Sequence, residues 1–216
     1  MSLQADDIHA IIVGRGLVKY KNIGPLGANT LGASTGDDPS VAESYYKIKL
    51  DVSRADKSIN LSRLAGSATE WNCVDIRTED SRCIMGPITP PSYIYTDEFS
   101  GCVFYLYRTG TRQVMGVHAY SGLKQEFAKS KSGKFGKVIN EVVREYSPTD
   151  FYTRNPGTLI CRYPTRQQLR TKDGENYLAF LSVVDTTAAM TFLFAYKNTP
   201  EGRRITRLVD DFYARF

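Results

Sequence analysis

Short stretches of the chain alternate between apolar and polar residues, a pattern typical of strands with one buried face. Residues 45–52 show it most clearly. Their apolar face carries Tyr46, Ile48, Leu50 and Val52, and their polar face carries Lys47, Lys49 and Asp51. Runs rich in apolar and aromatic residues predict further strands at residues 71–76, 93–95, 102–107, 113–120, 158–163, 177–184 and 188–196.

Other segments space their apolar residues as helices do. The residues that follow Asp6 and Asp7 are compatible with a first helical turn and then a short strand. Apolar residues at helical spacing predict an amphipathic helix within residues 135–146 and a last helix that begins at Pro200. The apolar stripe of this last helix would consist of Ile205, Leu208, Val209, Phe212 and Phe216.

The arrangement of these elements indicates a fold class. Residues 22–40 and 77–92 are rich in turn-forming residues and predict loops. No linker or internal repeat divides the sequence, so residues 1–216 are expected to form a single domain. We expect an α+β fold, with a mixed, mostly antiparallel β-sandwich-like core flanked by two or three helices.

The charge and hydropathy of the chain exclude few classes of protein. The net charge of +5 suits acidic partners or surfaces, but it is too small to indicate nucleic acid. No apolar run approaches the roughly 20 residues of a transmembrane helix, so no membrane span is expected. The acidic start, with Asp6 and Asp7 and no basic region before them, argues against a secretory signal peptide. A protein exported by a specialised secretion system would look the same.

The cysteines and histidines are few. The four cysteines are Cys73, Cys83, Cys102 and Cys161, and the two histidines are His9 and His118. No pair of cysteines has the CxxC spacing of a zinc site, so no metal site is expected. A disulfide between Cys73 and Cys83 is conceivable if the protein is exported.

One cysteine and one histidine fall in neighbouring predicted strands. Residues 102–107 and 113–120 flank a turn centred on Gly110, which predicts an antiparallel hairpin. With a turn of residues 109–111, Cys102 would lie opposite His118, Leu106 opposite Val114, and Arg108 opposite Arg112. Directly opposed residues have Cβ atoms about 4.5–5.5 Å apart on one face, whereas a slip of one residue would separate them.

A cysteine beside a histidine can act as a nucleophile. The imidazole takes the proton of the thiol, and the resulting thiolate attacks a carbonyl carbon. Candidates to orient the ring of His118 are the Thr96 hydroxyl, a backbone carbonyl, and the carboxylates of Asp97 and Glu98. Gly101 leaves room for substrate beside the nucleophile, and the backbone N–H of Cys102 could serve an oxyanion hole.

The same residues also fit a protein without catalysis. Cysteine is among the most buried residue types, and an apolar strand is a common place for an inert one. A single histidine in a strand is often a structural residue. Two hypotheses therefore stand at this point: an enzyme that uses the Cys-His pair, such as a protease or acyltransferase, and a non-enzymatic protein-binding module.

The segment from Thr96 to His118 resembles the glutamine deamidases related to the cytotoxic necrotizing factors, the Burkholderia lethal factor and the chemotaxis deamidase CheD. Residues 99–102 are similar to the Leu-x-Gly-Cys segment of that family, with Phe99 in place of Leu. Thr96 precedes the cysteine by six residues, as in several members. The resemblance implies that Cys102 is the nucleophile, that His118 is the general base and acid, and that Thr96 orients His118.

The resemblance also implies an activity and a setting. The chain would be a single catalytic domain that hydrolyses a Gln side-chain amide of a target protein to Glu through a Cys thioester, without a cofactor. Some relatives transfer the acyl group to amines instead. We expect a virulence-associated bacterial toxin or effector, secreted by a non-classical route into host cytoplasm, with a host protein as target; the alternative location is the bacterial cytoplasm.

Overall fold

The computed structural model describes residues 4–21, 41–43, 45–63, 70–76, 83–99, 102–109, 113–119, 158–163 and 171–216. The loop predicted at 22–40 and the helix predicted within 135–146 lie outside these residues. The helix is α1 (Ala5–Val13). The strands are β1 (Leu17–Lys21), β2 (Val41–Glu43), β3 (Tyr45–Ser53), β4 (Ser58–Arg63), β5 (Cys73–Ile76), β6 (Cys83–Ile88), β7 (Ser92–Phe99), β8 (Val103–Thr109), β9 (Gln113–Ala119), β10 (Thr158–Tyr163), β11 (Tyr177–Val184), β12 (Ala188–Thr199) and β13 (Gly202–Arg215).

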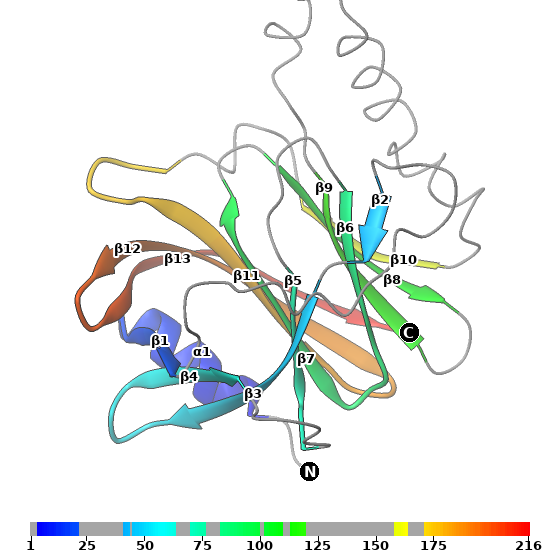
Figure 1. Ribbon diagram of the computed structural model, residues 1–216, viewed down its shortest axis with the longest axis horizontal. Coiled ribbons are helices and arrows are strands. Elements are labelled where there is room, and N and C mark those ends of the chain that lie inside the picture. Colours follow the sequence, from blue (N-terminus) through cyan, green and yellow to red (C-terminus); the bar gives the residue numbers. More distant parts are fainter. Residues whose placement is uncertain are drawn as a thin grey trace, which may run out of the picture.

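The strands form two sheets. One is a closed barrel with the strand order β1-β13-β12-β11-β7-β5-β3-β4, and the other has five strands in the order β10-β8-β9-β6-β2. Figure 1 shows the five-stranded sheet beside the barrel, near the strands β5, β7 and β11. The predicted α+β fold is therefore wrong, because the described residues are mostly strand and contain one short helix, α1.

Several predicted strands are confirmed. The alternation at residues 45–52 forms β3, in which Ile48 and Leu50 are buried and Lys47 is exposed. The strands predicted at 177–184 and 188–196 pair antiparallel as β11 and β12. The prediction of a loop over residues 77–92 is wrong where β6 forms, since β6 pairs antiparallel with β9.

The helix predicted after Pro200 is wrong, because those residues form the long strand β13. β13 pairs antiparallel with β12, and its register shifts twice, so that Thr206 and Val209 have no opposite residue. Each such bulge inserts one extra residue into β13, so the buried residues no longer alternate with exposed ones at every second position. Ile205, Leu208 and Val209 thereby acquire the spacing of a helix while they lie in a strand.

Apolar side chains gather in two clusters. The first, here called the barrel cluster, joins Ile8, Ile11 and Ile12 of α1 to residues from all eight barrel strands, so it marks the barrel interior. The second, here called the interface cluster, joins outward-facing residues of the barrel to β6, β8 and β9. Strand β11 serves both, since Phe180 lies in the interface cluster and Leu181 in the barrel cluster.

Two glycines allow the five-stranded sheet to approach the barrel closely. Gly86 of β6 and Gly116 of β9 lie opposite one another. A Cβ atom at Gly116 would lie 2.7 Å from Cδ1 of Ile76 and 2.8 Å from Cγ2 of Ile94, and one at Gly86 would meet Val74 at 2.6 Å. Because real Cβ atoms keep a larger distance, side chains at these two positions would push the sheets apart.

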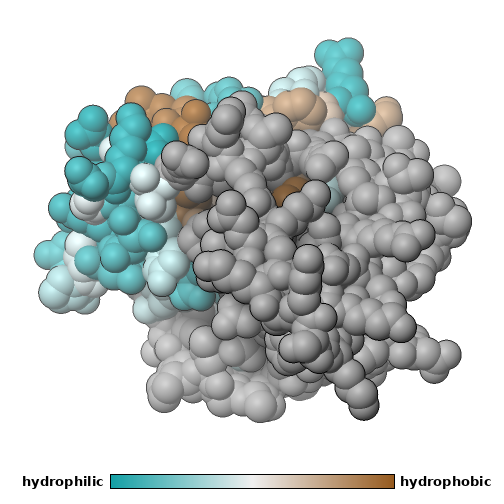
Figure 2. Space-filling model, turned by 90° about the horizontal axis from the view of Figure 1, so that it is seen from above, coloured by the Kyte–Doolittle hydropathy of each residue, from teal (hydrophilic) through white to brown (hydrophobic). Residues whose placement is uncertain are grey.

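Polar residues cover much of the described outer surface. Figure 2 shows mostly hydrophilic side chains over the end of the barrel that lies away from the five-stranded sheet. In the described parts of the chain, no helix is long and apolar enough to cross a membrane. Cys73 is a free, buried cysteine, so it does not form the disulfide with Cys83 that the sequence left open.

Candidate active site

The β8–β9 hairpin places His118 two residues away from its predicted register. Phe104 lies opposite His118, so the predicted pairing of Cys102 with His118 is wrong. The other predicted pairs shift likewise, with Leu106 opposite Gly116 and Arg108 opposite Val114. The turn predicted at Gly110 lies outside the described residues. Since the period of a strand is two, a shift of two residues keeps each side chain on its predicted face.

Cys102 directly precedes β8 and faces the barrel. It belongs to the interface cluster together with Phe99 and Phe104, it is 7% exposed, and it forms no disulfide. If the strand geometry is extended by one residue, Cys102 becomes the diagonal neighbour of His118, for which the distance is about 7–8 Å and the Cβ atoms are somewhat closer. Cys102 and His118 therefore lie at the same interface between the two sheets.

A bulge in β7 shapes the barrel wall that His118 faces. Thr96 lies opposite Phe180 of β11, whereas Phe99 lies opposite Leu178, so β7 holds one extra residue between these pairs. Within the extra length, Glu98 has φ 61°, a left-handed conformation that is rare for residues with a side chain. In a regular strand, Thr96 and Phe99 would point to opposite faces; the bulge turns both toward the five-stranded sheet.

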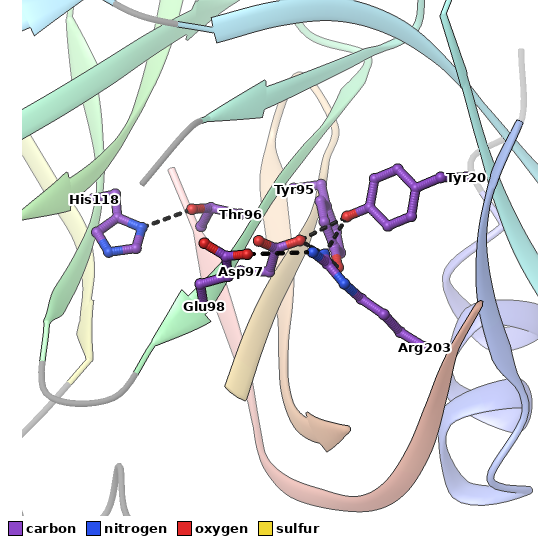
Figure 3. Close-up of polar contacts among 7 residues, drawn as sticks. All are labelled: Tyr20, Tyr95, Thr96, Asp97, Glu98, His118 and Arg203. Atoms are coloured by element: carbon purple, nitrogen blue, oxygen red, sulfur yellow. Dashed lines mark hydrogen bonds and ion pairs between the residues drawn. The ribbon is translucent and has the colours of Figure 1, made fainter. Parts of the chain in front are cut away.

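Both of these residues contact the His118 ring. The Thr96 hydroxyl forms a hydrogen bond of 2.9 Å with Nδ1 of His118, as Figure 3 shows. The Phe99 ring stacks on the imidazole, with ring centroids 3.8 Å apart and planes at 20°. The ring of His118 is thus fixed in position by one polar and one aromatic contact, both from β7.

Burial determines the charge of His118. The side chain is 1% exposed, and this burial lowers its pKa to about 3, because an imidazolium would lose its hydration. The ring is therefore neutral at physiological pH, with one nitrogen protonated and the other not. A neutral imidazole has an unprotonated nitrogen that can accept a proton, as a general base requires.

The second ring nitrogen, Nε2, is buried and has no hydrogen-bond partner among the described residues. A buried N–H without a partner is costlier and rarer than a buried acceptor without one. The tautomer that avoids this cost has its proton on Nδ1, which then donates to the Thr96 oxygen. Nε2 is left with a free lone pair.

The other candidates to orient His118 point elsewhere. Asp97 forms an ion pair with Arg203, and an Oε1 atom of Glu98 lies 3.7 Å from the same guanidinium. Of the possible side-chain partners, Thr96 is the one that hydrogen-bonds to His118. Gly101, the residue predicted to leave room for substrate, lies outside the described residues.

The sequence reasoning missed the polar group around Arg203, which lies beside the His118 contacts along β7 (Figure 3). Tyr20 donates a hydrogen bond of 2.6 Å to Asp97, and Arg203 donates one to Tyr20 and another, of 3.2 Å, to Tyr95. The guanidinium also packs over the ring of Tyr196, 4.9 Å from its centroid. These residues are spread from β1 to β13, so no short sequence motif predicts the polar group around Arg203.

The described residues contain no group of three or more His, Cys, Asp and Glu side chains placed to hold a metal ion. The chemistry that the arrangement offers is that of a thiol and a neutral imidazole. Cys102 would supply the nucleophile, His118 the proton acceptor, and Thr96 the contact that sets the tautomer.

No protein-family model and no curated protein sequence matches the chain. Among solved structures, the chain is similar to the crystal structure of the C-terminal domain of CNFy from Yersinia pseudotuberculosis. The similarity covers 98% of both chains, at 10% sequence identity and a TM-score of 0.38. A TM-score of this size does not establish a shared fold.

Proposed function

We propose that the protein is a cysteine-dependent glutamine deamidase, in which Cys102 is the nucleophile and His118 the general base and acid. The observation that carries the proposal is the state of His118. Its Nδ1 is held by Thr96, its ring is neutral, and its Nε2 is unpartnered among the described residues, at the interface where Cys102 lies. Nε2 is thus a vacant proton acceptor at this interface. Proton transfer from the thiol requires Cys102 to approach Nε2 within hydrogen-bond reach and the ring pKa to rise above about 3.

The reaction would proceed in two stages. The Cys102 thiol gives its proton to Nε2, and the sulfur attacks the amide carbon of a target glutamine. The imidazolium returns the proton to the departing nitrogen, which leaves as ammonia and produces a thioester. Neutral His118 then takes a proton from water, whose oxygen attacks the thioester; glutamate forms and the thiol is restored.

The choice of a glutamine amide depends on the resemblance of the segment from Thr96 to Cys102 to the glutamine deamidases. On the same basis, we propose that the protein is a bacterial toxin or effector that is secreted by a non-classical route and modifies a protein in host cytoplasm. Conversion of a neutral amide to a carboxylate adds one negative charge to the target, which can alter an active site or an interface.

The burial of Cys102 and His118 favours a second candidate function, a non-enzymatic binding module in which the β8–β9 hairpin belongs to the core.

Alkylation of the native protein distinguishes the deamidase from the non-enzymatic binding module. An active Cys102 should react with iodoacetamide faster than Cys73, the matched free and buried cysteine, and His118→Ala should slow it. If both thiols stay unreactive until the protein unfolds, the catalytic proposal is wrong.

The activity itself is tested on proteins of a host-cell lysate. Treatment with the wild type should convert particular Gln residues to Glu, each with a mass gain of about one dalton and release of ammonia. Cys102→Ala should abolish these conversions, whereas Cys73→Ala should retain them if circular dichroism shows both variants folded. Cleaved peptide bonds in place of Gln conversion would indicate a protease.

A further inference from the structure

The two bulge residues that do not contact His118, Asp97 and Glu98, both interact with the charged side chain of Arg203. Asp97 and Glu98 are the two residues between Thr96 and Phe99, the pair that contacts His118. Both carboxylates turn to Arg203, which forms an ion pair with Asp97 and lies 3.7 Å from Glu98. The two contacts with His118 and the two contacts with Arg203 therefore belong to four consecutive residues of one strand.

Arg203 is itself fixed in place. It lies at the start of β13, opposite Val18 of β1, where these strands close the barrel. Its guanidinium packs over the rings of Tyr20 and Tyr196, with the ring centroids 4.6 Å and 4.9 Å away, and it donates to the Tyr95 hydroxyl. The side chains of Arg203 and Asp97 are only 18% and 14% exposed, so water weakens their attraction less than at an open surface.

The bulge in β7 requires contacts such as those of Arg203 because its backbone is strained. A side-chain-bearing residue at φ 61° costs of order 1 kcal/mol or more relative to extended backbone, and it persists where surrounding contacts over-determine it. Without those contacts, β7 could relax to a regular pairing with β11. One of Thr96 and Phe99 would then turn away from His118, since residues three apart in a regular strand face opposite sides.

We infer that Arg203 is a positioning residue for the candidate active site: by holding Asp97 and Glu98, it keeps the bulge that places Thr96 and Phe99 against His118. Arg203 and His118 lie on opposite sides of β7 (Figure 3). Arg203 therefore affects the position of the His118 ring through the backbone of β7, without touching the ring. The consequence for catalysis rests on the proposed function, whereas the consequence for the His118 ring does not.

The first test observes the ring directly. The protein has only two histidines, so the imidazole ¹⁵N signals of His118 and His9 can be assigned, and exposed His9 serves as internal reference. The wild type should show one dominant His118 tautomer. Arg203→Gln should raise the minor tautomer about 2- to 10-fold, the factor that one net hydrogen bond is worth. The His9 signals should not change.

Matched variants separate positioning from charge. Arg204→Gln removes the neighbouring arginine, which is 41% exposed and pairs with Glu201, and it should leave the His118 signals as in the wild type. Glu98→Gly keeps the bulge, because glycine adopts positive φ freely, and should also preserve the tautomer. If Arg203→Gln does not fold, Asp97→Asn weakens the same ion pair and is measured instead.

The second test uses turnover of a target glutamine. Arg203→Gln should lower kcat by about 10- to 100-fold with little change in KM, because the catalytic base is misplaced. Arg203→Lys, which keeps the positive charge, should restore part of the lost kcat. An unchanged His118 tautomer in folded Arg203→Gln and Asp97→Asn overturns the inference. A changed tautomer together with an inactive wild type would uphold the inference and reject the proposed function.

Discussion

At the scale of single residues, the burial of His118 has a consequence for stability. The ordinary pKa of histidine is about 6.5, and burial in the folded protein lowers it to about 3. Between these values the unfolded chain binds a proton that the folded protein does not, so acid favours unfolding. Each pH unit below 6.5 therefore removes up to about 1.4 kcal/mol of stability until the pH reaches about 3.

We expect the wild type to lose about 2 kcal/mol of unfolding free energy between pH 7 and pH 5 through His118 alone. The His118→Gln variant should be less stable at pH 7 but should lack this part of the pH dependence. Urea unfolding at several pH values measures the difference. Equal slopes for wild type and His118→Gln would show that the ring is not held neutral.

At the scale of single elements, the site depends on how closely β9 approaches the barrel. Gly116 faces the same side as His118, two residues along the strand. Gly116→Ala should cost about 1–3 kcal/mol of stability, because the new methyl group would lie 2.7 Å from Cδ1 of Ile76. Ile76→Val removes that atom, so the double variant should be more stable than the sum of the single effects. Strict additivity in urea unfolding would contradict the close contact.

The bulges of β13 bring a second prediction at this scale. Thr206, one of the two residues of β13 without an opposite residue on β12, donates a hydrogen bond of 3.0 Å to Glu175, and Arg207 donates one of 2.8 Å to the same oxygen. Burial by itself would raise the pKa of Glu175, but the hydrogen bonds from Arg207, the Lys172 backbone and Thr206 outweigh it and lower the pKa. A lowered carboxyl pKa stabilises the fold at neutral pH, and this stabilisation is lost in acid.

Glu175→Gln should therefore reduce the unfolding free energy at pH 7 by about 1–3 kcal/mol, the value of hydrogen bonds to a charged group. The difference from the wild type should shrink as the pH falls below the ordinary glutamate pKa of about 4.3, where the unfolded chain takes up a proton before the folded carboxylate does. Thermal unfolding of both proteins at pH 7 and pH 3.5 measures it. Glu201→Gln, at an exposed ion pair with Arg204, is the control and should change stability by less than about 1 kcal/mol.

These elements also show how far the sequence could predict the structure. The alternation at residues 45–52 predicts β3 because no bulge interrupts it. In β13 and β7, bulges break the period, and they arise from pairing with distant strands that a local pattern does not contain. The motif from Thr96 to His118 contains the pair Thr96 and His118, which the fold joins by a hydrogen bond. The register of the hairpin and the position of Arg203, in contrast, depend on the barrel as a whole.

At the scale of the whole molecule, the two apolar clusters share their strands. Residues of β5, β7, β11 and β12 alternate between the barrel cluster and the interface cluster. Neither cluster can lose its packing without exposing the backs of the same strands. The described part of the barrel and the five-stranded sheet should consequently unfold as one cooperative unit, as the prediction of a single domain also requires.

We expect urea unfolding to give coincident transitions for far-ultraviolet circular dichroism, which follows all strands, and for the fluorescence of Trp71, the single tryptophan, which packs against the interface cluster. Phe180→Leu in the interface cluster and Leu181→Ala in the barrel cluster should each shift both transitions together, by about 1–5 kcal/mol. A variant that shifts the tryptophan signal alone would mean that the five-stranded sheet separates from a folded barrel. His118 would then leave Thr96 before the barrel unfolds, and the candidate site would be the least stable part of the molecule.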